Sequence, residues 1–482
     1  MRFIHEKYDC DIYAIADITD KPKNFFLNQK LTPIKKIWFY HDYVSKINKK
    51  PDLKYLSSIE EKYKINLWLL AYNERIFYRF NDYYKFSTDE VLSILEQECK
   101  LFESILEEAK PDFVIMGISV FHHDHIFYEM CKAKGIKTLI LKSTNLAYRY
   151  MISDGTETVN VKNYNDTITT TELQNFLKGF DPAKQGTELK LTFQNSKLDY
   201  FKAALKFLAS SNTNVKTHYT YFGRTKFQVI VKMLNYTLKK RYREFFMKRN
   251  LSYKVDDSWP FIYFPLHIEQ ERVLLIGAPF YTNQLEVITN IAKSLPVGYK
   301  LVVKEHPIMA LRGWHSTSYY KQIMELPNVQ LLHHSAKSDE ILKKCLLVIT
   351  ISGTSALEAA FYQKPAILFT DKDFSFLPSV YRIKSVEELP QAIRTSLKKE
   401  VNTTDLSKYV TFIKENSFNC NIQALGIATQ NYFQYGGFLA DVDIPTEKMQ
   451  SFLEEHRKSF ELIANEFIKK IQSYKTTHQA DL

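Results

Sequence analysis

The segment LLVITISGTSALEAAFYQKPAILF, residues 346–369, decides the fold class of this chain. The apolar runs at its two ends, 346–351 and 365–369, predict strands that are buried on both faces, because neither alternates with polar residues. Thr354–Tyr362 lies between them and predicts a helix. A strand, a helix and a strand joined by short links form a βαβ unit, which requires parallel strands in one sheet.

The same alternation continues on the amino-terminal side of this segment. We expect strands at Arg272–Ala278, Tyr299–Lys304 and Val329–His333, and helices at Gln284–Ser294 and Ser338–Lys344. Together with the 346–369 unit, these elements predict a doubly wound, Rossmann-like sheet in the second half of the chain.

The first third of the chain predicts a second domain of the same kind. An amphipathic helix at Thr88–Ala109 precedes an apolar strand, DFVIMGI at 112–118, a helix at Phe121–Lys134 and a further strand at 136–141. Shorter β-rich runs lie at 11–18 and 36–40. We therefore predict an α/β protein with two Rossmann-like, doubly wound domains that face each other across an interdomain cleft.

Four segments follow from this pattern. We predict an amino-terminal Rossmann-like acceptor and catalytic domain at 1–150, and a helical, basic insertion or linker at 151–258. A carboxyl-terminal Rossmann-like nucleotide-sugar domain is expected at 259–400, and a helical tail at 401–482. Within the insertion, Asp154–Thr171 is typical of a loop, and the strongly basic helix at Phe222–Lys248 is typical either of a solvated face or of an anionic membrane contact.

Composition narrows the class of protein. The 482 residues are 45% hydrophobic and 25% charged, which is typical of globular rather than disordered chains. The sequence contains neither an apolar run of about 20 residues nor a signal core. We therefore expect a cytoplasmic protein, either free or peripheral to the inner face of the cell membrane. The five scattered cysteines contain no CxxC pair and favour reduced thiols. The net charge of +11 favours anionic partners, but no nucleic-acid-binding motif is present.

Two polar segments follow strands of the second predicted sheet. Lys304, His306 and Pro307 come directly after one strand, where α/β sheets bind ligands. The loop Ser352-Gly353-Thr354-Ser355 follows another, and Glu358 lies one helical turn further on. Hydroxyl groups, a glycine and the start of a helix can cradle a phosphate, although a single hydroxyl there is also explained by helix capping. The pair of segments predicts a nucleotide site.

These two segments carry a resemblance. KEHP followed by SGTSALEAAFYQKPAILF resembles the carboxyl-terminal domain of bacterial capsule polysaccharide biosynthesis transferases, including β-Kdo transferases and, more distantly, bacterial sialyl- and polysialyltransferases. The resemblance covers residues 260–400 and is weaker in the first half, at DFVIMGISVFHHDHIFYE and AYNERIFYRF. It implies a GT-B fold in which His306, Pro307 and residues 352–355 hold the CMP part of a CMP-sugar. It also implies that His267 and Gln284 line the same cleft.

The catalytic carboxylate is expected in the first domain. We predict Asp124, which follows the strand at 112–118 and lies in the segment FHHDH, and as a second candidate Glu74. Either carboxylate could deprotonate an acceptor hydroxyl or attack the anomeric carbon. The side chains expected to contact substrate are Arg75, His122, His123 and His125. We predict no metal, because adjacent residues of one segment rarely converge on an ion and the two D-x-D triplets, at 371–373 and 441–443, occur commonly by chance.

The prediction is a metal-independent glycosyltransferase, without a cofactor, that moves a Kdo-like or sialic-like sugar from a CMP-linked donor. The acceptor would be a surface polysaccharide or a lipid-linked glycan. Two alternatives stay open: an enzyme like the UDP-GlcNAc 2-epimerases or a UDP-sugar transferase of the same fold, and a non-catalytic nucleotide-sugar-binding assembly subunit.

Overall fold

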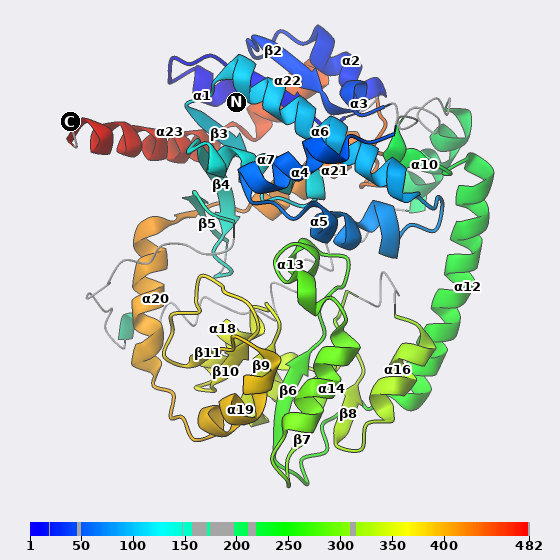
Figure 1. Ribbon diagram of the computed structural model, residues 1–482, viewed down its shortest axis with the longest axis vertical. Coiled ribbons are helices and arrows are strands. Elements are labelled where there is room, and N and C mark those ends of the chain that lie inside the picture. Colours follow the sequence, from blue (N-terminus) through cyan, green and yellow to red (C-terminus); the bar gives the residue numbers. More distant parts are fainter. Residues whose placement is uncertain are drawn as a thin grey trace. The chain divides into compact units, whose positions relative to one another are not determined.

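The computed structural model describes residues 1–18, 20–45, 50–146, 148–156, 171–173, 197–210, 218–308 and 315–480 (Figure 1). The chain divides into two compact units: the first spans 1–156, 184–229 and 417–482, and the second spans 157–183 and 230–416. Each unit combines strands and helices, so the predicted α/β class is confirmed. The loop predicted at Asp154–Thr171 lies almost entirely outside the described residues.

The second unit is built on one parallel sheet of six strands. The strand order is β11-β10-β9-β6-β7-β8, so the chain starts in the middle, moves to one edge and then crosses to the other side of its first strand. This is the order of the dinucleotide-binding α/β fold. The strands are β6 (Phe261–Pro265), β7 (Lys300–Lys304), β8 (Val329–Leu332), β9 (Leu347–Thr350), β10 (Ala366–Leu368) and β11 (Val380–Arg382).

Helices connect these strands and supply the core. Helix α14 contacts both α16 and α19 (Figure 1). Apolar side chains of all three helices pack with the strands in one buried cluster. Helix α18 packs on β9 and β10 and contacts α20. The helices are α13 (Arg272–Leu275), α14 (Gln284–Ser294), α16 (Thr317–Met324), α17 (Ser338–Lys344), α18 (Ser355–Phe361), α19 (Leu389–Leu397) and α20 (Thr403–Asn416), with single 3₁₀ turns at Pro279–Tyr281 and Val386–Glu388.

One predicted strand of this unit is wrong. Arg272–Ala278 (RVLLIGA) was predicted as a strand, but it begins with the short helix α13, and the first strand of the sheet is β6. An apolar run alone does not distinguish a strand from a buried helical turn. Leu274, Leu275 and Ala278 are buried in either conformation, whereas the aromatic run FIYFP of β6 occupies the centre of the sheet.

The first unit contains two smaller sheets. Strands β1 (Tyr13–Ala16) and β2 (Lys36–Phe39) pair in parallel. The second sheet has the order β12-β5-β4-β3, in which only β3 and β4 are parallel. Its strands are β3 (Phe113–Met116), β4 (Lys137–Ser143), β5 (Arg149–Ser153) and β12 (Phe418–Asn419). The βαβ unit predicted from 112 to 141 is therefore present, with α7 (His122–Ala133) as its helix.

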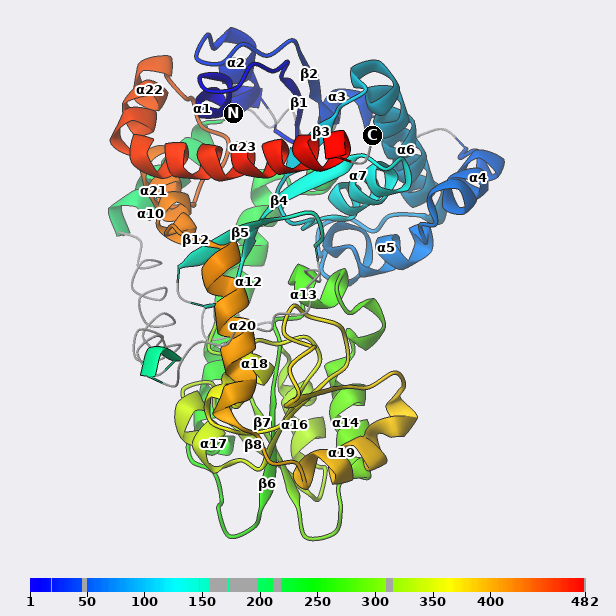
Figure 2. The same cartoon turned by 90° about the vertical axis from the view of Figure 1, so that its left-hand side faces the viewer.

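Long helices cover these strands. Helix α6 (Thr88–Ala109) begins at a capping box formed by Ser87 and Glu90, and its apolar face packs with α4, α5 and α7. In the tail, α23 (Arg457–Ala480) lies along α1 and the β3–β5 strands (Figure 2). The other helices of the unit are α1 (Arg2–His5), α2 (Asp20–Asn28), α3 (Tyr40–Tyr43), α4 (Leu53–Tyr63), α5 (Leu67–Asn73), a π-helical turn (Arg75–Arg79), α10 (Lys197–Ala209), a 3₁₀ turn (Tyr219–Tyr221), α21 (Ile422–Phe433) and α22 (Thr446–Glu455).

Helix α12 (Lys226–Asn250) runs from the first unit into the second. It carries many basic residues, and large apolar side chains such as Phe227, Leu234 and Leu238 are exposed along it. Within the described ranges, neither α12 nor any other helix combines the length and the apolar character that crossing a bilayer requires.

Candidate functional site

The topology of the second unit brings three strand ends together. Strand β6 is the first of the sheet and pairs with β7 on one side and with β9 on the other. The order in which successive strands are added reverses at this point, and open α/β sheets bind ligands in the crevice beyond the carboxyl ends of such strands. His267 follows β6, His306 follows β7, and the loop 352–355 follows β9, so the sequence-predicted residues of this unit gather at one switch point.

The backbone of His267 is fixed by Gln284, the first residue of α14. The Gln284 side chain accepts a hydrogen bond from the His267 N–H at 2.7 Å and donates one to its carbonyl oxygen at 3.0 Å. Gln284 is fully buried. The two hydrogen bonds hold His267 against α14 and leave its imidazole ring to point toward β9.

The imidazole of His267 contacts the next strand end. Its Nε2 lies 3.2 Å from Thr350 Oγ1 and accepts from the Ser352 N–H at 3.4 Å. Burial, with the charges of His306 and Lys372 nearby, lowers the pKa of His267 to about 3, so the ring is neutral. Because Nε2 accepts from a backbone N–H, the ring proton lies on Nδ1. Nδ1 is buried and has no hydrogen-bond partner among the described residues.

Two hydroxyl groups beside His267 also lack a partner. Within the described part of the chain, Ser352 Oγ and Ser355 Oγ are buried without a hydrogen bond. Gly353 lies between them, where an added Cβ would be 2.6 Å from Thr350 Oγ1 and 3.1 Å from both His267 Nε2 and Ser355 Oγ. Such crowding explains the glycine. Three unsatisfied donors around one glycine form a candidate anion site, since buried polar groups are otherwise paired.

Thr354, Glu358 and Lys304 have partners of their own. Thr354 Oγ1 donates to Glu358 Oε1 at 3.1 Å, and burial raises the pKa of Glu358. Lys304 Nζ is buried and donates to Ser338 Oγ at 2.6 Å, at the start of α17. These side chains therefore support the edges of the anion site.

The buried side chain of Glu305 stabilises the turn at His306 and Pro307. The buried Glu305 carboxylate accepts from the His306 N–H at 2.6 Å, from His315 Nδ1 at 2.7 Å and from the Tyr320 hydroxyl at 2.7 Å. His315 Nε2 lies 3.6 Å from a second carboxylate, that of Glu269. Burial alone would lower the pKa of His315, but Glu305 and Glu269 outweigh burial and raise it to about 9.

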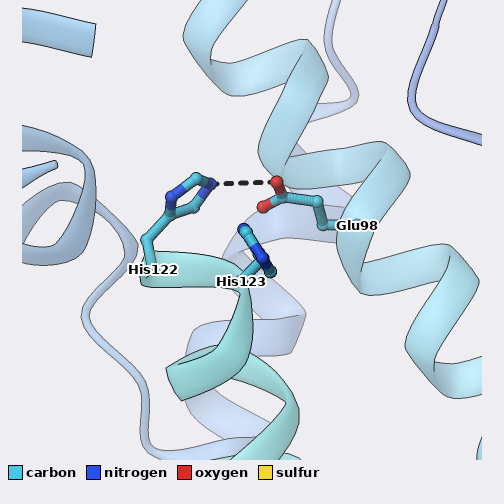
Figure 3. Close-up of side chains that lie close together, drawn as sticks. All are labelled: Glu98, His122 and His123. Carbon is cyan, nitrogen blue, oxygen red and sulfur yellow. Dashed lines mark hydrogen bonds and ion pairs between the residues drawn. The ribbon is translucent and has the colours of Figure 1, made fainter. Parts of the chain in front are cut away.

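A similar arrangement of buried charges lies in the first unit. His122 Nδ1 is 2.9 Å from Glu74 Oε2. On the other side of the ring, Nε2 is 2.9 Å from Glu98 Oε1 (Figure 3). Tyr40, which itself contacts Tyr219, donates to the same Glu98 oxygen. Burial alone would lower the pKa of His122, but the two carboxylates raise it to about 10. Glu98 and Tyr40 were missed by sequence reasoning, because α6 and the segment after β2 lie far apart in the chain.

Glu98, His122 and His123 are also the one group within the described residues whose spacing could suit a metal ion. One ligand atom from each of the three lies within 4.8 Å of the others (Figure 3). Adjacent histidines thus converge here, contrary to the expectation from the sequence. However, both ring nitrogens of His122 already bond to carboxylates, so an ion would have to displace a proton and the hydrogen bond to Glu98.

Asp124 and Arg75 hold the turn that leads into α7. Asp124 Oδ2 accepts from the N–H groups of Val120 and Phe121, at 3.0 and 3.1 Å. Arg75 donates to the Val120 carbonyl oxygen, and its guanidinium lies 4.6 Å from the centre of the Phe121 ring. His125 lies one residue further along α7, 3.9 Å from Glu129. The predicted catalytic residues Asp124 and Glu74 therefore both make structural hydrogen bonds to the start of α7.

A third group in the first unit joins the predicted residue His123 to two residues that were not predicted, Asp17 and His41. Asp17 follows β1, and its two carboxylate oxygens lie 2.9 Å from His41 Nε2 and 3.5 Å from His123 Nε2. His41 lies just beyond the end of β2. The sequence does carry one signal for Asp17, which directly follows the apolar run YAIA. That run was predicted only to be β-rich.

Comparison with known proteins finds one family model that matches part of the chain. Residues 178–377 match the family model described as capsule polysaccharide biosynthesis protein. No curated protein matches the sequence.

Several solved structures are similar at low identity. A β-Kdo 2,7 transferase, KpsC of Thermosulfurimonas dismutans, is 10% identical, with coverage of 83% of this chain and 89% of that chain and a TM-score of 0.32. The UDP-GlcNAc 2-epimerase of Methanocaldococcus jannaschii is 12% identical, with coverage of 84% and 100% and a TM-score of 0.24. The UDP complex of S. aureus MnaA is 11% identical, with coverage of 88% and 96% and a TM-score of 0.27. Likenesses at this level do not bear on the activity of this chain.

Proposed function

We propose that this chain is a glycosyltransferase of surface polysaccharide synthesis, because residues 178–377 match the family model described as capsule polysaccharide biosynthesis protein. It takes a sugar from a CMP-linked donor, which binds at the switch point of the second unit. The acceptor is a surface glycan or a lipid-linked glycan.

The observation that carries this proposal is the set of unsatisfied donors around Gly353. His267 Nδ1, Ser352 Oγ and Ser355 Oγ are buried, and no described residue satisfies them. A phosphate oxygen accepts hydrogen bonds from just such N–H and O–H groups. Because α18 has only seven residues, we assign the anion to these side chains rather than to the helix dipole.

The donor set favours a nucleotide with one phosphate. It consists of a neutral imidazole and two hydroxyls, with the cationic side chain of Lys304 directed to Ser338 instead. A diphosphate brings a second charged group, which is commonly met by further cations or a divalent ion. A divalent ion would need carboxylate ligands, but in the D-x-D triplet of the second unit Asp371 already pairs with Arg382 at 3.3 Å. A CMP-sugar carries a single phosphate, so it needs neither further cations nor a divalent ion at this set of donors.

Helix α12 supports a peripheral membrane location for the enzyme. Exposed cations and exposed apolar side chains occur together along this helix, a combination that anionic lipid surfaces attract. A lipid-linked acceptor would be reached from such a surface. We therefore propose that α12 contacts anionic lipid.

Calorimetry with the purified full chain and CMP, CDP, UDP and GDP, without added metal, tests the donor assignment. We expect CMP to bind most tightly, and the Ser352→Ala variant to bind it at least tenfold more weakly, because one charge-assisted hydrogen bond is lost. The control Ser396→Ala changes a buried serine of α19 and leaves binding unchanged. A preference for UDP would contradict the CMP assignment and favour a UDP-sugar enzyme.

A further inference from the structure

We infer that Asp17 is the catalytic carboxylate of the first unit and that His41 and His123 position it. This inference rests on the proposed transferase function and names a residue of that reaction. Neither the family match nor the sequence patterns point to Asp17.

The three side chains come from the carboxyl ends of separate strands. Strands β1 and β2 are parallel and in register from Tyr13 with Lys36 to Ala16 with Phe39, so Asp17 and His41 lie at the same edge. His123 comes from the second residue of α7, after β3. Residues that gather at the carboxyl ends of parallel strands are placed where α/β proteins bind substrates.

The side chain of Asp17 is much more exposed than those of His41 and His123. The Asp17 side chain is 43% exposed, whereas those of His41 and His123 are 4% and 7% exposed. Of the three, only Asp17 is open to a substrate. The histidines lie behind it, where the rings of Tyr40 and Phe121 stack against His123 at centroid distances of 4.7 and 5.5 Å.

The two histidines keep the carboxylate charged and oriented. Burial would raise the pKa of Asp17, but contacts with His123 and His41 outweigh it and hold the pKa well below its usual range. His41 Nε2 lies 2.9 Å from one Asp17 oxygen, and His123 Nε2 lies 3.5 Å from the other and 3.6 Å from Asp124 Oδ1. By contrast, Asp124 is bound to two backbone N–H groups, and Glu74 is buried against His122.

This geometry suits a general base. The acceptor oxygen forms a bond to the anomeric carbon while the bond from that carbon to the phosphate oxygen breaks. The electron pair of the broken bond leaves with CMP, and the hydroxyl proton passes to the Asp17 carboxylate. Although a carboxylate of low pKa is a weak base, the hydroxyl becomes strongly acidic as its oxygen bonds to carbon, so the proton transfers late in the same step.

The test compares two aspartates at opposite ends of one strand. Asp17→Asn removes the base at the carboxyl end of β1, and the control Asp11→Asn changes an exposed aspartate before its amino end, where it pairs with Lys35. Three quantities are measured on each full-length variant: the melting temperature, the Kd for CMP, and the rate of CMP release from CMP-Kdo and CMP-N-acetylneuraminic acid with water as acceptor.

We expect Asp17→Asn to melt normally and to bind CMP within twofold of the wild type, while CMP release falls at least 100-fold. Asp11→Asn keeps all three values. His123→Asn lowers kcat without changing KM, as a positioning residue does. An Asp17→Asn variant that releases CMP at the wild-type rate overturns the assignment of Asp17 and leaves the proposed function standing. A wild-type protein that neither binds nor releases CMP overturns the proposed function, and the assignment falls with it.

Discussion

Gly353 is the residue on which the geometry of the candidate anion site depends most directly. We predict that Gly353→Ala weakens CMP binding by at least tenfold, because the new Cβ would lie 2.6 Å from Thr350 Oγ1 and 3.1 Å from His267 Nε2. The loop must then shift by several tenths of an ångström, and overpacking of this kind costs about 1–3 kcal/mol. Calorimetric titration with CMP measures the effect.

The matched control is Gly426→Ala, since nothing lies within 4 Å of an added Cβ at that position of α21. Alanine is the better helix former there, so the control should bind CMP like the wild type and melt no lower. If Gly353→Ala binds CMP as tightly as Gly426→Ala does, the nucleotide does not depend on the 352–355 loop.

Single residues also show where sequence reasoning stops. The His306 turn and the 352–355 loop could be identified because each follows an apolar strand directly in the sequence. Asp17 and Glu98 could not be identified, because the histidines that they contact lie more than 20 residues away in the sequence. Asp124 in the segment FHHDH was predicted because it follows an apolar strand, yet in the structure its carboxylate accepts hydrogen bonds that hold the start of a helix.

Among the elements, α12 leads to a direct prediction. We expect the full chain to bind vesicles of anionic phospholipid, and Lys232→Glu with Lys239→Glu to weaken that binding at least tenfold. Each of these exposed lysines contributes about 1 kcal/mol near an anionic surface. Co-sedimentation with vesicles of 30% phosphatidylserine, roughly a cytoplasmic-leaflet charge density, measures the bound fraction.

The control pair is Lys398→Glu with Lys399→Glu, which removes the same charge from exposed lysines beyond α19. It should bind vesicles as the wild type does. Equal loss in both pairs would mean that net charge alone, and not α12, attracts the membrane.

Most elements could be predicted from their patterns, and the exceptions have a physical cause. The boundaries of Thr88–Ala109, predicted from its apolar face, match those observed, and in the structure a capping box and a left-handed residue, Lys110, mark its two ends. The strand predicted at Arg272–Ala278 was wrong because an apolar run without periodicity fits both a strand and a helical turn. The short strand β1 alternates exposed and half-buried residues, so its sequence indicated only a β-rich run.

At the scale of the whole molecule, each unit contains a buried histidine between two carboxylates. In the first unit His122 lies between Glu74 and Glu98, and in the second His315 lies between Glu305 and Glu269. Apolar patterning predicts many of the strands of the three sheets, but it does not predict these networks, because each one joins segments that the fold alone brings together. The networks make the stability of both units depend on pH.

The sign of that dependence follows from the pKa values. The pKa values of His122 and His315 rise from 6.5 to about 10 and about 9, so their stabilising contribution is complete below pH 6.5 and is lost as the pH rises through 9 to 10. The pKa of Glu74 falls from 4.5 to about 2 through its hydrogen bond with His122, despite burial, so its contribution is complete above pH 4.5 and is lost in acid. The free energy of unfolding should therefore be highest between about pH 4.5 and 6.5 with respect to these groups.

We predict that the urea midpoint of the wild type falls between pH 6.5 and pH 9.5, and that His122→Gln removes the part of this fall that belongs to the first unit. At pH 6.5 the substitution should itself cost about 3–5 kcal/mol, because it leaves two buried carboxylates without their cation. His456→Gln, a change at a more exposed histidine at the end of α22, serves as the control and should keep both the midpoint and its pH dependence. A wild-type midpoint that does not change from pH 6.5 to 9.5 would mean that neither histidine is positively charged in the folded chain over this range. In that case His122 would be neutral, with a ring nitrogen available to an ion beside Glu98 and His123.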